Sequence, residues 1–177
     1  MEQEIGILIH AREPDDYSFF VERNLTSREE IERLKADTSD KEREKYNQGI
    51  QSTFERKLVA KIFEASSEKP DEKIALQLVR ESIKARKTHL ALEILSHLDP
   101  SRINIPLQEL ESMVRDSILN LACEQFSFGV CIENCPYNMM WDDNYNCSNT
   151  FQLAYDVIKK YFDLKTATKA IGGILNK

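Results

Sequence analysis

Four cysteines carry the most specific chemistry that this sequence could offer. They are Cys123, Cys131, Cys135 and Cys147, and the middle two have the spacing Cys-x3-Cys. Structural zinc is held tetrahedrally by four soft ligands, often in two closely spaced pairs. This sequence has a single such pair, and Cys123 falls on an apolar helical face, where cysteine is common as a small hydrophobic residue. We expect ordinary reduced thiols and no metal, with a four-cysteine zinc site as the alternative.

The three histidines, His10, His89 and His97, form no obvious catalytic or metal-binding pattern. No two of them are four residues apart, the spacing that would place two ligands on one face of a helix. His89 and His97 lie eight residues apart on a predicted helix, so we expect surface or helix-cap roles. An enzyme with a cysteine nucleophile, Cys131 or Cys135, stays an alternative because a histidine partner would meet it only in space.

Motifs for cofactors and phosphates give no positive signal. Asp142, Asn144 and Asn146 resemble the start of a calcium loop, which requires Gly at its sixth position and Glu at its twelfth. Those positions are Cys147 and Leu153 here. The sequence also contains no glycine-rich phosphate loop and no Gly-x-Ser-x-Gly motif. It therefore predicts a non-catalytic protein without a cofactor.

Residues 135–146, which we call the aromatic/acidic loop, break the regular hydrophobic periodicity of the chain. Long irregular segments inside a domain often carry function. Tryptophan, tyrosine and methionine are also enriched in protein interfaces and their hot spots. The alternative is that these side chains complete the core beneath the loop. The predicted partner-binding residues are Tyr137, Met139, Met140, Trp141, Asp142, Asp143 and Tyr145.

The composition of the chain favours a helical protein. Its 177 residues are 41% hydrophobic and 31% charged, with only 5 Gly and 5 Pro, fewer than the turns of an all-β fold usually need. The net charge of −6 disfavours nucleic acid as a main partner. The apolar run Ile5–Ile9 is too short for a signal peptide or a membrane span, so we expect a cytoplasmic protein without membrane insertion.

The clearest helical pattern predicts a helix over residues 40–65. Its apolar stripe recurs every four residues, at Tyr46, Ile50, Phe54, Leu58 and Ile62. Capping boxes are predicted at Thr26 with Glu29 and at Ser39 with Glu42. Residues 1–11 are interpreted as a strand or an extended arm packed on the first helix.

Further helices are predicted on the C-terminal side of residue 66, where Ser66–Pro70 interrupts the pattern. Asp71 is a candidate N-cap for the first of them, Thr88 begins the second and Pro106 opens the third. The sequence Asp99-Pro100-Ser101 predicts a turn, since proline cannot continue a helix.

Three helix starts share a local pattern of a hydrophobic residue, an amide, leucine and a small or branched apolar residue. They are 74–79, 117–122 and 149–154, and their leucines, Leu78, Leu121 and Leu153, are 121 − 78 = 43 and 153 − 121 = 32 residues apart. These motifs resemble divergent forms of the Thr-Pro-Leu-His-Leu-Ala motif of ankyrin repeats, which are about 33 residues long. Leu90–Pro100 is similar to an ankyrin second helix and the loop after it.

The ankyrin resemblance covers about residues 71–177 and implies an all-α fold of stacked helical hairpins. It also implies that the aromatic/acidic loop is a finger between repeats, a position that contacts partners. The chain departs from the family in lacking the Pro-His pair and the glycine between the two helices. Another family of α-solenoids and an irregular helical bundle are the structural alternatives.

Together these observations predict two segments and a binding function. Residues 1–70 form an N-terminal helical segment with a long charged amphipathic helix, and residues 71–177 form a helical-repeat-like region packed on it as one unit. We expect a scaffold that binds a partner protein through the aromatic/acidic loop and an adjoining concave helical face. A zinc-stabilised regulatory domain and an enzyme with a cryptic cysteine site are the alternatives. The sequence predicts no particular oligomeric state.

Overall fold

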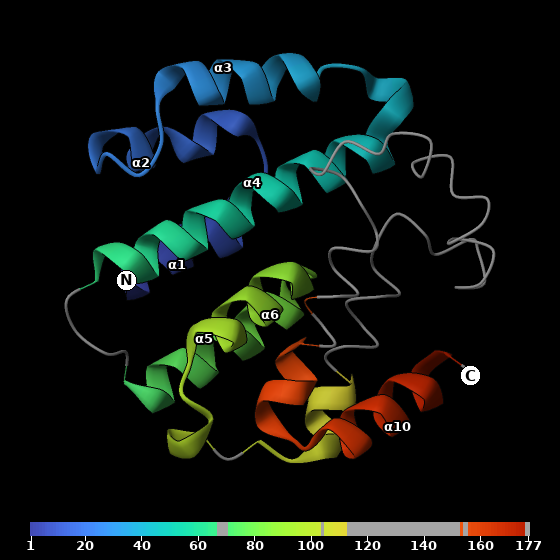
Figure 1. The fold of residues 1–177 in the computed structure, drawn as a ribbon. Coiled ribbons are helices and arrows are strands. Elements are labelled where there is room, and N and C mark those ends of the chain that lie inside the picture. The colour runs from blue at the N-terminus through green and yellow to red at the C-terminus, as the bar shows by residue number, and fades with distance from the viewer. Residues whose placement is uncertain (67–70, 104, 113–152, 154–155, 176–177) are drawn as a thin grey trace.

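The computed structural model describes residues 1–66, 71–103, 105–112, 153 and 156–175 (Figure 1). In this part of the chain the regular structure consists of helices and includes no strand, which confirms the all-α prediction at that level. The α-helices with described bounds are α1 (Glu2–His10), α2 (Ser18–Glu22), α3 (Arg28–Asp37), α4 (Glu44–Ala65), α5 (Glu72–Lys84), α6 (Thr88–His97) and α10 (Leu164–Leu175). The 3₁₀-helices are η1 (Pro14–Tyr17), η2 (Lys41–Arg43) and η3 (Pro100–Arg102).

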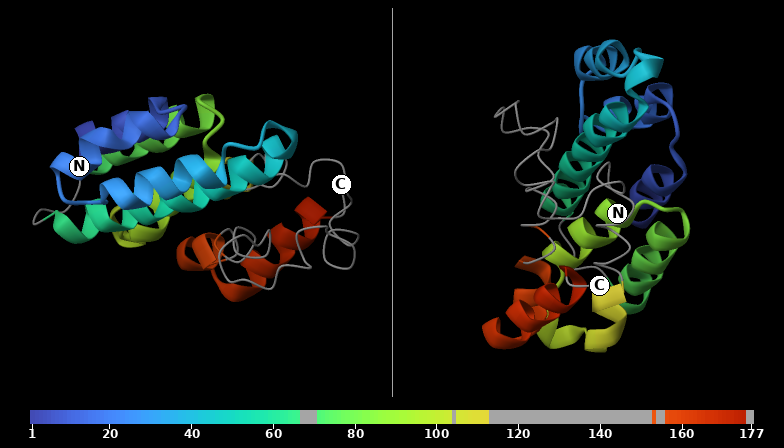
Figure 2. Two further views of the ribbon diagram at one scale, coloured as in Figure 1. Left: turned by 90° about the horizontal axis from the view of Figure 1, so that it is seen from above. Right: turned by 90° about the vertical axis from the view of Figure 1, so that its right-hand side faces the viewer.

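Helix α4 is the central element, and it contacts α1, α3 and α6 (Figure 1). Helix α5 packs against both α6 and α1. Figure 1 and the right-hand view of Figure 2 place α3 and α10 at opposite ends of the molecule. Buried residues from Ile5 to Ala167 form one hydrophobic core, so both predicted segments contribute to the same packed interior. None of the described helices is long and apolar enough to cross a membrane.

The predicted apolar stripe explains why α4 is central. Ile50, Leu58 and Ile62 are each at most 5% exposed, and Val59 beside them is fully buried. Because α-helical neighbours recur every three or four residues, these side chains line one face of the helix and pack into the core. The helix runs from Glu44 to Ala65, close to the predicted range 40–65.

The first eleven residues correct one prediction. They form the helix α1 rather than a strand or an extended arm. Ile5, Leu8 and Ile9, spaced i, i+3 and i+4, are at most 1% exposed and fix a helical face against the core. Glu4 favours the helix start, where it also pairs with the amino group of Met1.

Helix caps agree with the sequence at one start and differ at two. Asp71 accepts hydrogen bonds from the backbone amides of Lys73 and Ile74, as predicted for the start of α5. The cap of α3 is Ser27, in a capping box with Glu30, one residue after the predicted pair of Thr26 and Glu29. The hydroxyl of Thr26 instead donates to the Glu30 carboxylate over 2.7 Å, which draws that carboxylate toward the helix start.

The second predicted capping box is wrong because η2 intervenes before α4. The side chain of Asp40, rather than that of Ser39, accepts from the backbone amide of Glu42. The Ser39 hydroxyl donates back to the Ala36 carbonyl oxygen. Helix α4 therefore begins at Glu44, a few residues later than predicted.

Of the three predicted repeat starts, only the first lies mainly in the described part of the chain. It opens α5, which packs on α6 across the short turn 85–87. Arg86 in this turn has φ 60°, in the left-handed region that often ends a helix. The motifs at 117–122 and 149–154 lie outside the described residues apart from Leu153, so the stacked-hairpin arrangement stays a prediction.

Candidate functional site: a buried polar cluster around Glu55

The strongest concentration of ionisable side chains surrounds Glu55 on α4. Its side chain is 1% exposed, although a buried carboxylate is costly unless donors surround it. Oε1 accepts from the Tyr17 hydroxyl and from the Lys87 ammonium, each over 2.5 Å. Oε2 lies 2.6 Å from Nε2 of His89, which donates to it. We call Tyr17, Gln51, Glu55, Lys87 and His89 the Glu55 cluster.

Lys87 connects this cluster to the end of α1. Besides Glu55, its ammonium donates to the carbonyl oxygens of Leu8 and Ala11, both over 2.6 Å. The last carbonyl groups of a helix lack partners within it and favour a cation. Each of the three ammonium hydrogens thus has an acceptor. The turn containing Arg86 brings Lys87 to this position directly before α6.

Tyr17 brings η1 to the same junction. Gln51 Nε2 donates to the Tyr17 hydroxyl over 2.6 Å and to the Arg12 carbonyl oxygen over 3.3 Å. The Tyr17 ring meets Phe54 edge-on, with ring centroids 5.1 Å apart. Burial and the nearby Glu55 charge raise the pKa of the Tyr17 phenol, so its hydroxyl keeps its proton and acts as a donor to the carboxylate.

The electrostatics of the cluster favour an ionised Glu55. Burial acts to raise the pKa of Glu55, but the hydrogen bond from His89 and the charges of His89 and Lys87 outweigh it, so the pKa is lowered from 4.5. Burial lowers the pKa of Lys87, and the Glu55 charge opposes this effect. The lysine therefore depends on Glu55 as its counter-ion.

A carboxylate that holds an imidazole is also the arrangement that orients a histidine for general-base catalysis. In this cluster, however, both carboxylate oxygens accept hydrogen bonds from the chain, and the His89 side chain is 11% exposed. The groups join α1, η1, α4 and α6 to one another. In the described residues, no group of three or more His, Cys, Asp or Glu side chains is arranged to hold a metal ion.

A smaller cluster around Glu93 joins α4 to α6. Arg56 Nε donates to Glu93 Oε2 over 2.8 Å, and His97 Nε2 lies 3.3 Å from Oε1. The His97 ring stacks on Phe63 with ring centroids 4.8 Å apart and an angle of 9°. Burial acts to raise the pKa of Glu93, but the hydrogen bonds from His97 and Arg56 lower it overall. This ion pair, too, holds two helices together.

Comparison with known proteins gives no family assignment. No family model, curated protein or solved structure matches the chain. The functional argument therefore rests on the residues of this chain and on their geometry.

The structure corrects the role predicted for one histidine and agrees with that of another. We expect both His89 and His97 at the surface or in helix caps, but His89 donates to the buried carboxylate of Glu55. His97 is exposed in the last turn of α6, as predicted, and also contacts Glu93. His89 lies 34 residues from its partner in the sequence, so helical periodicity could not pair them. The available signal was the position of Glu55, four residues before Val59 on the apolar face of α4.

The predicted partner-binding residues lie outside the described part of the chain. This holds for the aromatic/acidic loop with Tyr137, Met139, Met140, Trp141, Asp142, Asp143 and Tyr145, and for all four cysteines, Cys123, Cys131, Cys135 and Cys147. Both the binding role of the loop and the state of the cysteines stay predictions.

The lowered pKa of Glu55 predicts a specific dependence of stability on pH. The carboxylate stabilises the fold above its ordinary pKa of 4.5, and this contribution is lost as the pH falls through the lower folded-state value. We expect the difference in free energy of unfolding between wild type and Glu55→Gln to narrow below about pH 4.5. Urea unfolding at pH 7, 5, 4 and 3 measures it. A difference that stays constant down to pH 3 would contradict the assignment.

Proposed function

We propose that this protein is a non-catalytic protein-binding module whose helical framework supports the aromatic/acidic loop. The observation that carries the proposal is the use of the buried ionisable groups. Glu55, Lys87 and His89 join helices to one another, as do Glu93 and Arg56. Because these ionisable groups already bind other groups of the chain, they suit a rigid framework better than a reaction centre, whose groups must be free to contact a substrate.

The described segments that flank the loop in the sequence are packed into the core. Before it, Leu110 is fully buried, and after it Val157 and Ile158 are at most 1% exposed. Functional loops are commonly carried by a rigid scaffold. The loop holds the only tryptophan of the chain, Trp141, with acidic residues directly after it. An aromatic anchor beside carboxylates suits a partner surface that combines an apolar pocket with basic residues.

The proposal is tested by capture of partner proteins on the immobilised chain. Extract from the native source is passed over wild type and over Trp141→Ala/Asp142→Ala, and retained proteins are quantified by mass spectrometry. Loss of a hot-spot aromatic costs at least about 2 kcal/mol, so we expect retention of the partner to fall about thirtyfold.

A matched control removes an aromatic residue and an aspartate from the described framework, Phe19→Ala/Asp15→Ala. Phe19 is half-buried and Asp15 is exposed, and both lie far from the loop in sequence. Far-UV circular dichroism and thermal unfolding establish that each variant is folded. The proposal fails if the Trp141 variant, correctly folded, retains the same proteins as wild type, or if the control loses the same proteins equally.

A further inference from the structure

The C-terminal residues carry the opposite charge to the rest of the chain. Residues 156–177 contain five lysines and two aspartates, a net charge of +3, whereas residues 1–155 contain 19 basic and 28 acidic residues, a net charge of −9. The five cations of this segment are all lysines. A charge reversal of this kind within one chain indicates a surface with its own electrostatic partner.

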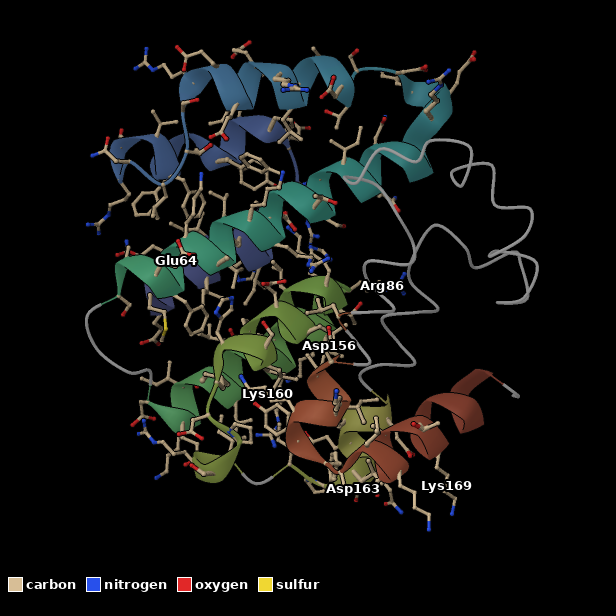
Figure 3. The ribbon with its side chains drawn as sticks, viewed as in Figure 1. Glu64, Arg86, Asp156, Lys160, Asp163 and Lys169 are labelled. Carbon is tan, nitrogen blue, oxygen red and sulfur yellow. The ribbon has the colours of Figure 1, made fainter. Side chains whose placement is uncertain are left out.

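The side of this segment that faces the core is fixed by contacts with α6. The Lys160 ammonium donates to the Ser96 carbonyl oxygen, and the Tyr161 hydroxyl donates to the Leu95 carbonyl oxygen over 3.1 Å. Both acceptors lie in the last turn of α6, where carbonyl groups lack partners within the helix, and the Leu95 oxygen also accepts from the backbone amide of Leu98 at the C-cap. Lys160, which Figure 3 shows beside α6, is therefore used within the fold.

The orientation of α10 follows from its first turn. Asp163 accepts from the backbone amide of Thr166 over 3.0 Å and from its hydroxyl over 2.7 Å, which fixes the start of the helix. Ala167 is fully buried and marks the side of α10 that packs on the core. The opposite side of the helix must face outward.

Lys165 and Lys169 lie opposite Ala167, and the exposed residues of α10 among its described side chains are Leu164, Lys165, Thr168 and Lys169. Leu164 and Thr168 form one row with i, i+4 spacing, and Lys165 and Lys169 form the neighbouring row with the same spacing. Leu164 is 54% exposed, and among the described residues it is the one large hydrophobic side chain that is exposed. Figure 3 shows Lys169 at the edge of the molecule, away from α4. We call these four residues the Lys165 face.

We propose that the Lys165 face is a second contact surface, which binds an acidic segment of a partner protein with an apolar side chain against Leu164. Lys165 and Lys169, one turn apart, complement two carboxylates on an extended or helical segment. This inference goes beyond the proposed function, because it does not involve the aromatic/acidic loop.

The size and chemistry of the face favour a protein segment over nucleic acid or a membrane. A DNA-binding surface commonly neutralises about six to ten phosphates with lysine and arginine, and surfaces for single strands add aromatic stacking. The Lys165 face offers two lysines and no aromatic residue. Membrane anchoring by a surface helix needs a wide apolar face, and stable attachment needs a second signal. Among the described side chains of α10, Leu164 is the one large hydrophobic residue that is exposed.

The test uses a fluorescein-labelled peptide of ten glutamates around two central leucines, and fluorescence anisotropy measures its binding. The measurement is made in about 20 and about 150 mM NaCl, because charges are screened weakly at the lower concentration and strongly at the higher one. Wild type should bind, and more weakly at the higher salt concentration. Lys165→Gln/Lys169→Gln should weaken binding about fivefold, since each exposed pair contributes at most about 1 kcal/mol. The matched control is Lys57→Gln/Lys61→Gln, an exposed pair with the same spacing on α4, and should change binding less than about twofold.

Several results would overturn the inference. Absence of peptide binding at low salt would do so, as would equal weakening by the two lysine pairs. Tighter binding of wild type to phosphatidylserine vesicles or to a DNA duplex, lost with Lys165→Gln/Lys169→Gln, would assign the face to another class of partner. If peptide binding is lost in Trp141→Ala/Asp142→Ala and kept in Lys165→Gln/Lys169→Gln, the peptide binds at the aromatic/acidic loop instead.

Discussion

Replacing Glu55 with alanine is expected to lower the free energy of unfolding by about 3–5 kcal/mol, because it removes one partner of a buried ion pair. The substitution leaves the Lys87 ammonium without a counter-ion, and it removes the acceptor of the Tyr17 hydroxyl and of His89. Native domains are stable by only about 5–15 kcal/mol, so the variant should unfold at markedly lower urea concentration. Equilibrium unfolding followed by far-UV circular dichroism measures the change.

The matched control for this prediction is Glu64→Ala on the same helix. Glu64 is exposed near the C-terminal end of α4 (Figure 3), so its removal should change the free energy of unfolding by no more than about 0.5 kcal/mol. If Glu55→Ala fails to fold, Glu55→Gln preserves the shape of the side chain and removes only its charge. A loss below about 1 kcal/mol with either Glu55 variant would mean that the cluster does not hold the junction together.

Lys87→Met is expected to cost about 3 kcal/mol and to loosen α1 more than the rest of the fold. The substitution keeps an unbranched apolar chain but removes the donor to the carbonyl oxygens of Leu8 and Ala11. Hydrogen exchange should therefore accelerate in residues 2–11 more than in α10. Lys84→Met, an exposed lysine one turn earlier, is the control and should leave both the free energy of unfolding and the exchange pattern nearly unchanged.

A double variant separates the ion pair from its individual residues. Glu55→Leu combined with Lys87→Met replaces both charges by apolar groups, and such replacements are often much less costly than removal of one partner. We expect the double variant to be more stable than the sum of the two single losses predicts, by at least about 1 kcal/mol. Additive losses would show that Glu55 and Lys87 act independently.

The sequence predicted the helices whose apolar faces are regular. Helix α4 followed from its four-residue stripe, and α5 and α6 followed from Asp71 and Thr88. Prediction failed where two local patterns competed. In residues 1–11 the adjacent apolar residues fit either a strand or a helix, and the burial of Ile5, Leu8 and Ile9 decided for the helix.

The candidate site was harder to predict because its contacts are long-range. Lys87 meets the carbonyl oxygen of Leu8 across 79 positions of sequence, and Tyr17 meets Glu55 across 38. Helical periodicity identifies which face of a helix is buried, but it does not say which other segment covers that face. A charged residue on the apolar side of α4 was the one local sign that a polar junction existed.

Hydrogen exchange of the full chain, alone and bound to the partner retained in the capture experiment, tests the central proposal most directly. The proposal predicts slower exchange in peptides that cover residues 135–146 and no change in peptides that contain Glu55 or His89. Slower exchange around Glu55 and His89, with residues 135–146 unchanged, would contradict it and would assign binding to the helical junction.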